Sequence, residues 1–119
     1  MIAALAVTAA AAVSVTSVVL ARDDPPPRFS ADVQPIFDGK CVSCHPVSYE
    51  YLDLRRGRSY DDLFRVSSAT KPAFARVLPG RPELSYLLIH PPDPSLRGLL
   101  TSDERATIAD WIRAGARND

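Results

Sequence analysis

The sequence predicts an all-α protein in which an N-terminal hydrophobic helix precedes one small helical domain. Three observations predict this fold class. The first 21 residues carry no charged side chain. Further along, apolar residues recur at helical spacing behind capping residues, and no segment alternates between apolar and polar residues as a β-strand would. All 14 basic and all 14 acidic residues follow residue 21. Because this balance leaves no basic footprint, we expect no nucleic-acid partner.

Residues 1–21 form the expected hydrophobic helix. They are mostly Ala, Val, Leu and Ile, and as a helix they would span about 30 Å, which matches the apolar core of a bilayer. A transmembrane anchor is favoured, and the alternative is a secretory signal cleaved after Ala21, because small residues precede that point. Residues 22–28 contain three consecutive prolines and predict a stiff spacer. Residues 29–119 then form a single domain.

The domain is expected to begin with a short helix that leads into residues 41–45. Ser30 is a suitable N-cap for this helix. Pro35 lies early enough in it to be tolerated. Its apolar face is expected to consist of Val33, Ile36 and Phe37.

Three more helices are expected downstream. The S-x-x-D pattern at residues 59–62 predicts a cap for a turn or two of helix. Pro82 suits the first turn of a helix that ends before the next two prolines. Thr101 and Glu104 form a capping box for the last helix, which Gly115 is placed to end. The apolar stripe of that helix, expected to face the core, consists of Ile108, Trp111 and Ile112.

Residues 41–45 use both cysteines of the chain and one of its two histidines in the pattern C-x-x-C-H. This is the pattern that attaches c-type haem. Two thiols three positions apart can reach the two vinyl groups of a porphyrin, and the adjacent imidazole can then bind the iron as its fifth ligand. The motif predicts one covalent haem c with its iron, held by Cys41 and Cys44, with His45 as the proximal ligand.

Other interpretations of the motif are weaker. A thioredoxin-like redox pair requires a strand–helix–strand setting, which the flanking residues do not predict. A zinc site requires four ligands, and His90 is the only candidate besides the three residues of the motif. Zinc ligands usually come in closely spaced pairs, whereas His90 lies far downstream of the motif. A disulfide between Cys41 and Cys44 would close a very small loop and stabilise little.

The chain resembles the small monohaem cytochrome c domains of bacterial exported proteins. The resemblance lies in residues 29–37, which run into the C-x-x-C-H motif, and in residues 79–87 and 100–116. It implies an all-α, cytochrome c-like fold around one covalently bound haem. In that fold the first and last helices cross, and the haem lies between helices with one edge reaching solvent. Cys41 and Cys44 carry over as the thioether residues and His45 as the proximal ligand.

The residue expected as the sixth iron ligand differs from the one found in that family. Its members usually place a methionine followed by proline before the last helix, whereas the only methionine here is Met1. His90, followed by proline, lies in the corresponding region and is the predicted distal ligand. Lys40, Lys71, water or an open site are the alternatives.

The predicted function is single-electron transfer between a redox protein donor and an acceptor outside the cytoplasmic membrane. The chain is then an electron carrier and not an enzyme. Because c-type haem is attached outside the bacterial cytoplasm, we expect the protein in the inner membrane with its haem domain on the periplasmic side. It would be soluble in the periplasm if cleaved at Ala21.

Two further possibilities stay open from the sequence. A five-coordinate iron would suit gas sensing or peroxide chemistry. Alternatively, the protein is a subunit of a larger membrane electron-transfer complex, in which the arginine-rich residues 55–58 contact an acidic partner. A solvated loop is the ordinary interpretation of such residues.

Overall fold

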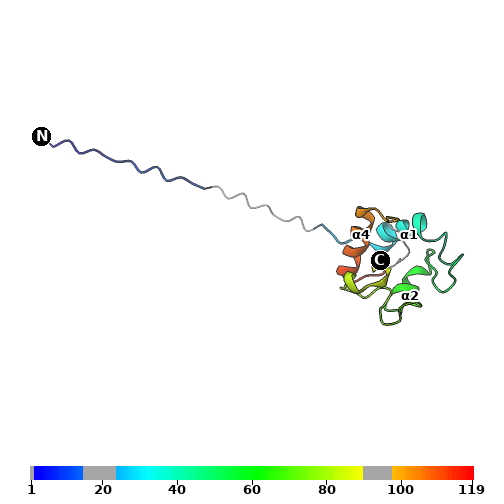
Figure 1. Ribbon diagram of the computed structural model, residues 1–119. Coiled ribbons are helices and arrows are strands. Elements are labelled where there is room, and N and C mark those ends of the chain that lie inside the picture. Colours follow the sequence, from blue (N-terminus) through cyan, green and yellow to red (C-terminus); the bar gives the residue numbers. More distant parts are fainter. Residues whose placement is uncertain (1, 15–23, 90–97) are drawn as a thin grey trace.

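A computed structural model describes residues 2–14, 24–89 and 98–119 of the protein. The regular elements are helices that gather in one body (Figure 1). In chain order they are η1 (Phe29–Val33), α1 (Gln34–Lys40), α2 (Ser59–Leu63), η2 (Pro82–Leu84), α3 (Tyr86–Ile89) and α4 (Ser102–Arg113). The first, η1, is a π-helix, and η2 is a 3₁₀-helix.

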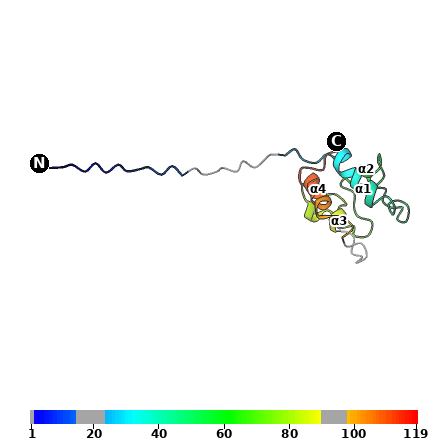
Figure 2. The same ribbon diagram turned by 90° about the horizontal axis from the view of Figure 1, so that it is seen from above.

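The N-terminal segment differs from its prediction. Residues 2–14 form no helix and extend away from the helical body in both views (Figures 1 and 2). Their side chains pack against nothing, and Leu5 is 91% exposed. In the described ranges, no helix is long and apolar enough to cross a membrane. The transmembrane anchor predicted over residues 1–21, and the inner-membrane location that depended on it, are therefore wrong. The physical reason is that a helix with no packing partner is only marginally stable.

The core lies where the first helical turns meet the last helix. Phe29 of η1 packs against Trp111 of α4 with ring centroids 5.0 Å apart, and against Tyr60 of α2 at 5.4 Å. The indole of Trp111 is 1% exposed, and its Nε1–H donates to the carbonyl of Arg117 at 2.9 Å. These contacts confirm that the stripe of α4 faces the core, and they join the two ends of the domain.

Between α2 and η2 the chain forms neither a helix nor a regular sheet. Phe64 and Val77 form an isolated parallel bridge, and Ser67 and Ala75 form an antiparallel one. Arg65, the second residue after α2, adopts a φ of 59°. Because this left-handed conformation cannot continue a helix, the chain turns away there and runs beside residues 74–77.

The predicted all-α, cytochrome c-like fold is wrong. Only 36% of the described residues are helical, and three of the four α-helices have seven residues or fewer. The radius of gyration of the chain is 24.8 Å, against about 14 Å for a compact domain of this length, because residues 2–14 extend away from the helical body (Figure 1). The expected helical cage around a cofactor is replaced by short helical elements, of which only α4 exceeds seven residues in the described ranges, joined by long turns.

Candidate functional site

The residues of the C-x-x-C-H motif lie on a run of hydrogen-bonded turns that continues directly from α1. The amide of Cys41 donates to the carbonyl of Phe37 at 2.8 Å, which extends the helix by one residue. The amide of His45 donates to the carbonyl of Cys41 at 2.9 Å, and that of Cys44 donates to the same carbonyl at 3.2 Å. These bonds bring both cysteines and the histidine onto one compact turn, as the motif requires.

Lys40, the residue before the motif, anchors this turn to α4. Its ammonium group lies 2.9 Å from Oε1 of Glu104 and donates to the carbonyl of Leu99 at 2.8 Å. Glu104 also accepts from the amide of Thr101 in the predicted capping box, which the structure confirms. The Thr101 amide and the Lys40 ammonium hold the pKa of Glu104 below its usual value. Lys40 is thus committed to α4, which leaves it poorly placed as an iron ligand.

Both cysteines are free thiols. Cys44 is exposed, whereas Cys41 is half-buried against the core. Burial is the main cause that raises the pKa of Cys41 to about 11, and the nearby Glu104 carboxylate adds to it. Reactive redox cysteines and zinc-binding thiolates have lowered pKa values. The environment of Cys41 therefore argues against a thioredoxin-like pair.

His45 is surrounded by two tyrosine rings that follow it in the chain. The imidazole lies 5.4 Å from the ring of Tyr49 and 6.1 Å from that of Tyr51. Its backbone carbonyl accepts from the amide of Leu54 at 3.3 Å. Because Leu54 is 2% exposed, this bond ties the histidine to the core.

A cavity of about 40 Å³ opens beside His45. Its apolar lining comes from the loop after the motif, from α2 and from α3, and its polar lining comes from residues 68–70 and 76 and from Tyr86. The lining residues used below are Leu52, Leu63, Leu87, Ser68, Thr70 and Arg76. Elements distant in sequence thus meet at the histidine of the motif.

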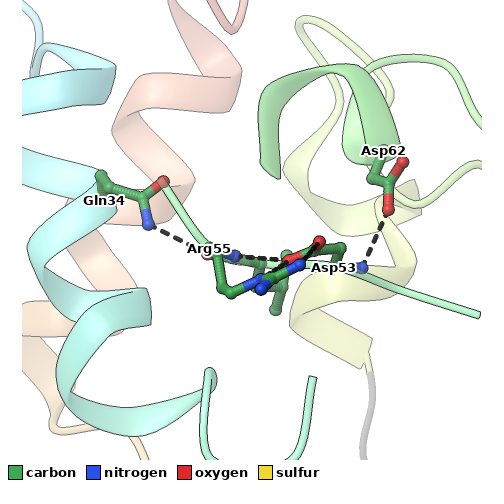
Figure 3. A network of polar contacts seen from close by, with 5 residues as sticks. Gln34, Asp53, Arg55 and Asp62 are labelled. Carbon is green, nitrogen blue, oxygen red and sulfur yellow. Dashed lines mark hydrogen bonds and ion pairs between the residues drawn. The ribbon is translucent and has the colours of Figure 1, made fainter. Parts of the chain in front are cut away.

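The segment that closes the loop after the motif is held from two sides (Figure 3). On one side, Nε2 of Gln34 in α1 donates to the carbonyl of Leu54 at 2.9 Å. On the other, Oδ2 of Asp62 in α2 accepts from the amide of Asp53 at 2.8 Å. Arg55 forms a two-pronged pair with Asp53, at 3.0 and 2.7 Å, and this pair holds the pKa of Asp53 at about 2. The position of residues 53–55 relative to α1 and α2 is therefore fixed.

The remaining candidate residues are not brought to this cavity. Lys71 is exposed and does not line the cavity. In the arginine-rich loop, Arg55 pairs with Asp53 and Arg56 with Asp38 at 3.3 Å, so two of its three charges have acidic partners within the chain. His90 lies outside the described residues, and the predicted distal ligand stays a prediction.

The described part of the chain contains no group of three or more His, Cys, Asp or Glu side chains that could hold a metal ion. The prediction of a metal-binding, membrane-bound cytochrome is therefore wrong for the described residues, in which no such group of side chains is seen. A haem iron is a different case, because the porphyrin supplies most of its ligands and the protein adds only axial ones.

The donor set fits a covalent haem. Two free thiols and an imidazole share one turn, and the imidazole lines a partly apolar cavity. The cavity is much smaller than the 300–1,000 Å³ that ligand pockets usually occupy. Residues 51–52 and 68–70, which enclose it, therefore have to separate around a macrocycle. That separation would break the bond of the Arg76 Nη2–H to the Tyr51 carbonyl and the bond of the Ser68 amide to the Phe74 carbonyl.

Sequence reasoning missed the two tyrosines beside His45 and the arginine in the cavity. The tyrosines had a signal, since Tyr49 and Tyr51 closely follow the motif. Arg76 had none, because its role depends on carbonyl groups 14 and 25 residues away. Comparisons of the chain with protein-family models, with curated proteins and with solved structures find no match.

Proposed function

We propose that this chain binds one haem covalently through Cys41 and Cys44, with His45 as an axial ligand, and transfers single electrons. One observation carries the proposal: two free thiols and an imidazole share a hydrogen-bonded turn, and His45 lines a partly apolar cavity. Bound haem would supply a reversible one-electron change at its iron.

The thiols of the two cysteines perform the attachment. Each S–H adds across a vinyl C=C bond, so that sulfur bonds to one carbon and the hydrogen goes to the other. The addition needs no external oxidant, but it needs reduced cysteines, and both cysteines are free. The short distance along the turn places both sulfurs at the same edge of the macrocycle.

The chain positions the axial imidazole through its backbone and the neighbouring rings. The Leu54 amide fixes the carbonyl of His45, and the rings of Tyr49 and Tyr51 restrict the imidazole. Cys44 of the motif and Tyr49, which follows it, are both exposed. An exposed attachment turn suits electron transfer, because a partner protein can then approach the macrocycle edge closely.

Among the described residues, the cavity lining contains no carboxylate and no imidazole other than that of His45, which favours electron transfer over peroxide chemistry. A sixth protein ligand on the iron would favour electron transfer, whereas a five-coordinate iron would favour peroxide chemistry. His90 stays the predicted sixth ligand.

The test is co-expression with a c-type haem maturation system, followed by haem staining after denaturation. The wild type and Ser43→Ala, which changes the exposed residue between the cysteines, should stain equally. Cys41→Ala combined with Cys44→Ala should lose all covalent stain, because no thiol remains to form a thioether. Stain that survives in the double variant would contradict the proposal.

A further inference from the structure

The cavity beside His45, in the haem-free chain, has space for a small ligand only. Leu52, Leu63 and Leu87 supply aliphatic walls, and Arg76 supplies a guanidinium. A water-sized group needs about 10–15 Å³ of such space, so the cavity of about 40 Å³ takes roughly three or four heavy atoms. A ligand of this cavity is therefore a small ion or molecule.

Arg76 is held in place along both its backbone and its side chain. Its amide donates to the carbonyl of Val66 at 2.7 Å, and its carbonyl accepts from the amide of Leu87 at 3.0 Å. Nη1 donates to the carbonyl of Asp62 and Nη2 to that of Tyr51, each at 2.9 Å. Because the guanidinium is fixed before a ligand arrives, little side-chain freedom is lost on binding.

The charge of Arg76 has no carboxylate partner among the described residues, in contrast to that of Arg55 and Arg113. A guanidinium carries five N–H donors, and the two bonds to carbonyls leave three of them for a ligand. A half-buried cation without a counter-ion is costly, and a bound anion would relieve that cost. The charge in this lining therefore favours an anion.

Two hydroxyls in the lining add further donors. Ser68 is 4% exposed, and its Oγ accepts from the amide of Lys71 at 3.2 Å. The Thr70 hydroxyl lies 3.4 Å from that of Ser68 and donates to that of Tyr86 at 3.4 Å. Hydroxyl pairs normally lie at about 2.5–3.0 Å, so these contacts are long. An anionic oxygen would be a stronger acceptor for such hydroxyls.

We infer that this cavity binds a small monovalent oxyanion, of the size of nitrate, nitrite or formate. Arg76 is its counter-ion, and the hydroxyls of Ser68 and Thr70 donate to its oxygens. Sulfate and phosphate are larger, and a second negative charge would be buried against leucine side chains. The inference concerns the haem-free chain and does not rest on the proposed function, because admission of a macrocycle would break the bond between Arg76 and Tyr51.

The test titrates the full, haem-free chain with sodium nitrate, with sodium fluoride holding the ionic strength constant. Nuclear magnetic resonance follows the Nε–H signal of Arg76 and the amide signal of Thr70. Both should shift and saturate, and sodium sulfate should bind at least about tenfold more weakly, because burial of its second charge is costly. Shifts that do not saturate, or equal affinities for nitrate and sulfate, would overturn the inference with the wild type alone.

Three variants then separate the cavity from general charge. Arg76→Gln should weaken nitrate binding at least about tenfold, the loss expected for charge-assisted hydrogen bonds. Arg58→Gln removes an equal charge from an exposed side chain and should leave binding unchanged. Thr70→Val removes one hydroxyl at nearly constant volume and should weaken binding about two- to tenfold.

The variant at position 70 decides the question if Arg76→Gln does not accumulate. Wild-type affinity for nitrate in Arg76→Gln, or in Thr70→Val when it alone is available, would overturn the inference. An equal loss of affinity in Arg58→Gln and Arg76→Gln would overturn it as well, because general charge would then explain the binding. None of these results depends on haem stain, so the proposed function is judged separately.

Discussion

Cys41 lies against the core, and we propose that its thiol also takes part in covalent attachment. Burial favours the neutral thiol, and this is the main reason its pKa rises to about 11. A neutral, reduced thiol is stable toward disulfide formation and metal binding, yet it can still add to a vinyl group. Under the proposed function, this environment would keep the thiol of Cys41 reduced before attachment.

The raised pKa of Cys41 predicts a pH-dependent stability in the haem-free protein. The thiol ionises near pH 9 when unfolded and near pH 11 when folded, so the unfolded state loses its proton first. Its contribution is fully present below pH 9 and is lost between pH 9 and 11, and the loss amounts to about 2 kcal/mol. Urea unfolding of the wild type and Cys41→Ala across this range measures it. Parallel curves for the two proteins would contradict the assignment.

At the scale of single residues, the sequence predicts a role well where the partners are close in the chain. Thr101 and Glu104 are three positions apart, and their capping box forms as predicted. Ser59 was expected to cap α2, but its hydroxyl donates instead to Oε1 of Gln34, 25 residues earlier. Ser30 does not act as an N-cap, because η1 begins at Phe29 and its N-cap position is occupied by Arg28. The amide of Arg28 donates to the carboxylate of Asp32. Local patterns do not reveal such distant partners.

Among the elements, α1 and α2 depend on one buried polar contact. Gln34 and Ser59 are 1% and 0% exposed, and the Ser59 hydroxyl donates to the Gln34 side chain, which in turn donates to Leu54. The Gln34 bond to Leu54 (Figure 3) and the Ser59 bond to Gln34 position both helices against the loop that follows the C-x-x-C-H motif. A buried polar group that loses its partner costs about 1–3 kcal/mol.

Ser59→Ala should accordingly destabilise the protein by about 1–3 kcal/mol, because Oε1 of Gln34 is left buried without its donor. The exposed Ser48→Ala should change stability by less than about 0.5 kcal/mol. Denaturant unfolding of both variants, and of Gln34→Ala alone and combined with Ser59→Ala, gives the coupling energy, expected at about 1 kcal/mol. Strictly additive effects would show that the contact contributes nothing.

The boundaries of helices, like the roles of single residues, are predictable where local contacts set them. The helix expected from Pro82 onward is divided into η2 and α3 at Ser85. The buried Ser85 hydroxyl donates to the carbonyl of Arg81 at 2.9 Å and accepts from the amide of Leu78 at the same distance. These bonds compete with helix formation. The end of α4 was predictable, because Gly115 adopts a φ of 112° that favours glycine.

For the whole molecule, the predicted fold class failed, whereas the residues of the C-x-x-C-H motif lie on one hydrogen-bonded turn. Hydrophobic spacing predicted helices at the two ends of the domain, and η1, α1 and α4 form there with Trp111 in the core. The chain between them has little periodic signal, and its conformation depends on contacts such as the bridge of Phe64 with Val77. Residues 2–14 show that an apolar run does not become a helix without a surface to pack against.

The central claim, covalent haem on the C-x-x-C-H turn, is tested most directly by peptide mass spectrometry. After expression with a c-type haem maturation system, trypsin cleaves after Lys40 and Arg55 and releases residues 41–55, which contain both cysteines and His45. The account predicts that this peptide is heavier by the mass of one haem, with neither cysteine open to alkylation. A peptide of unmodified mass, with both cysteines alkylated, would contradict the account.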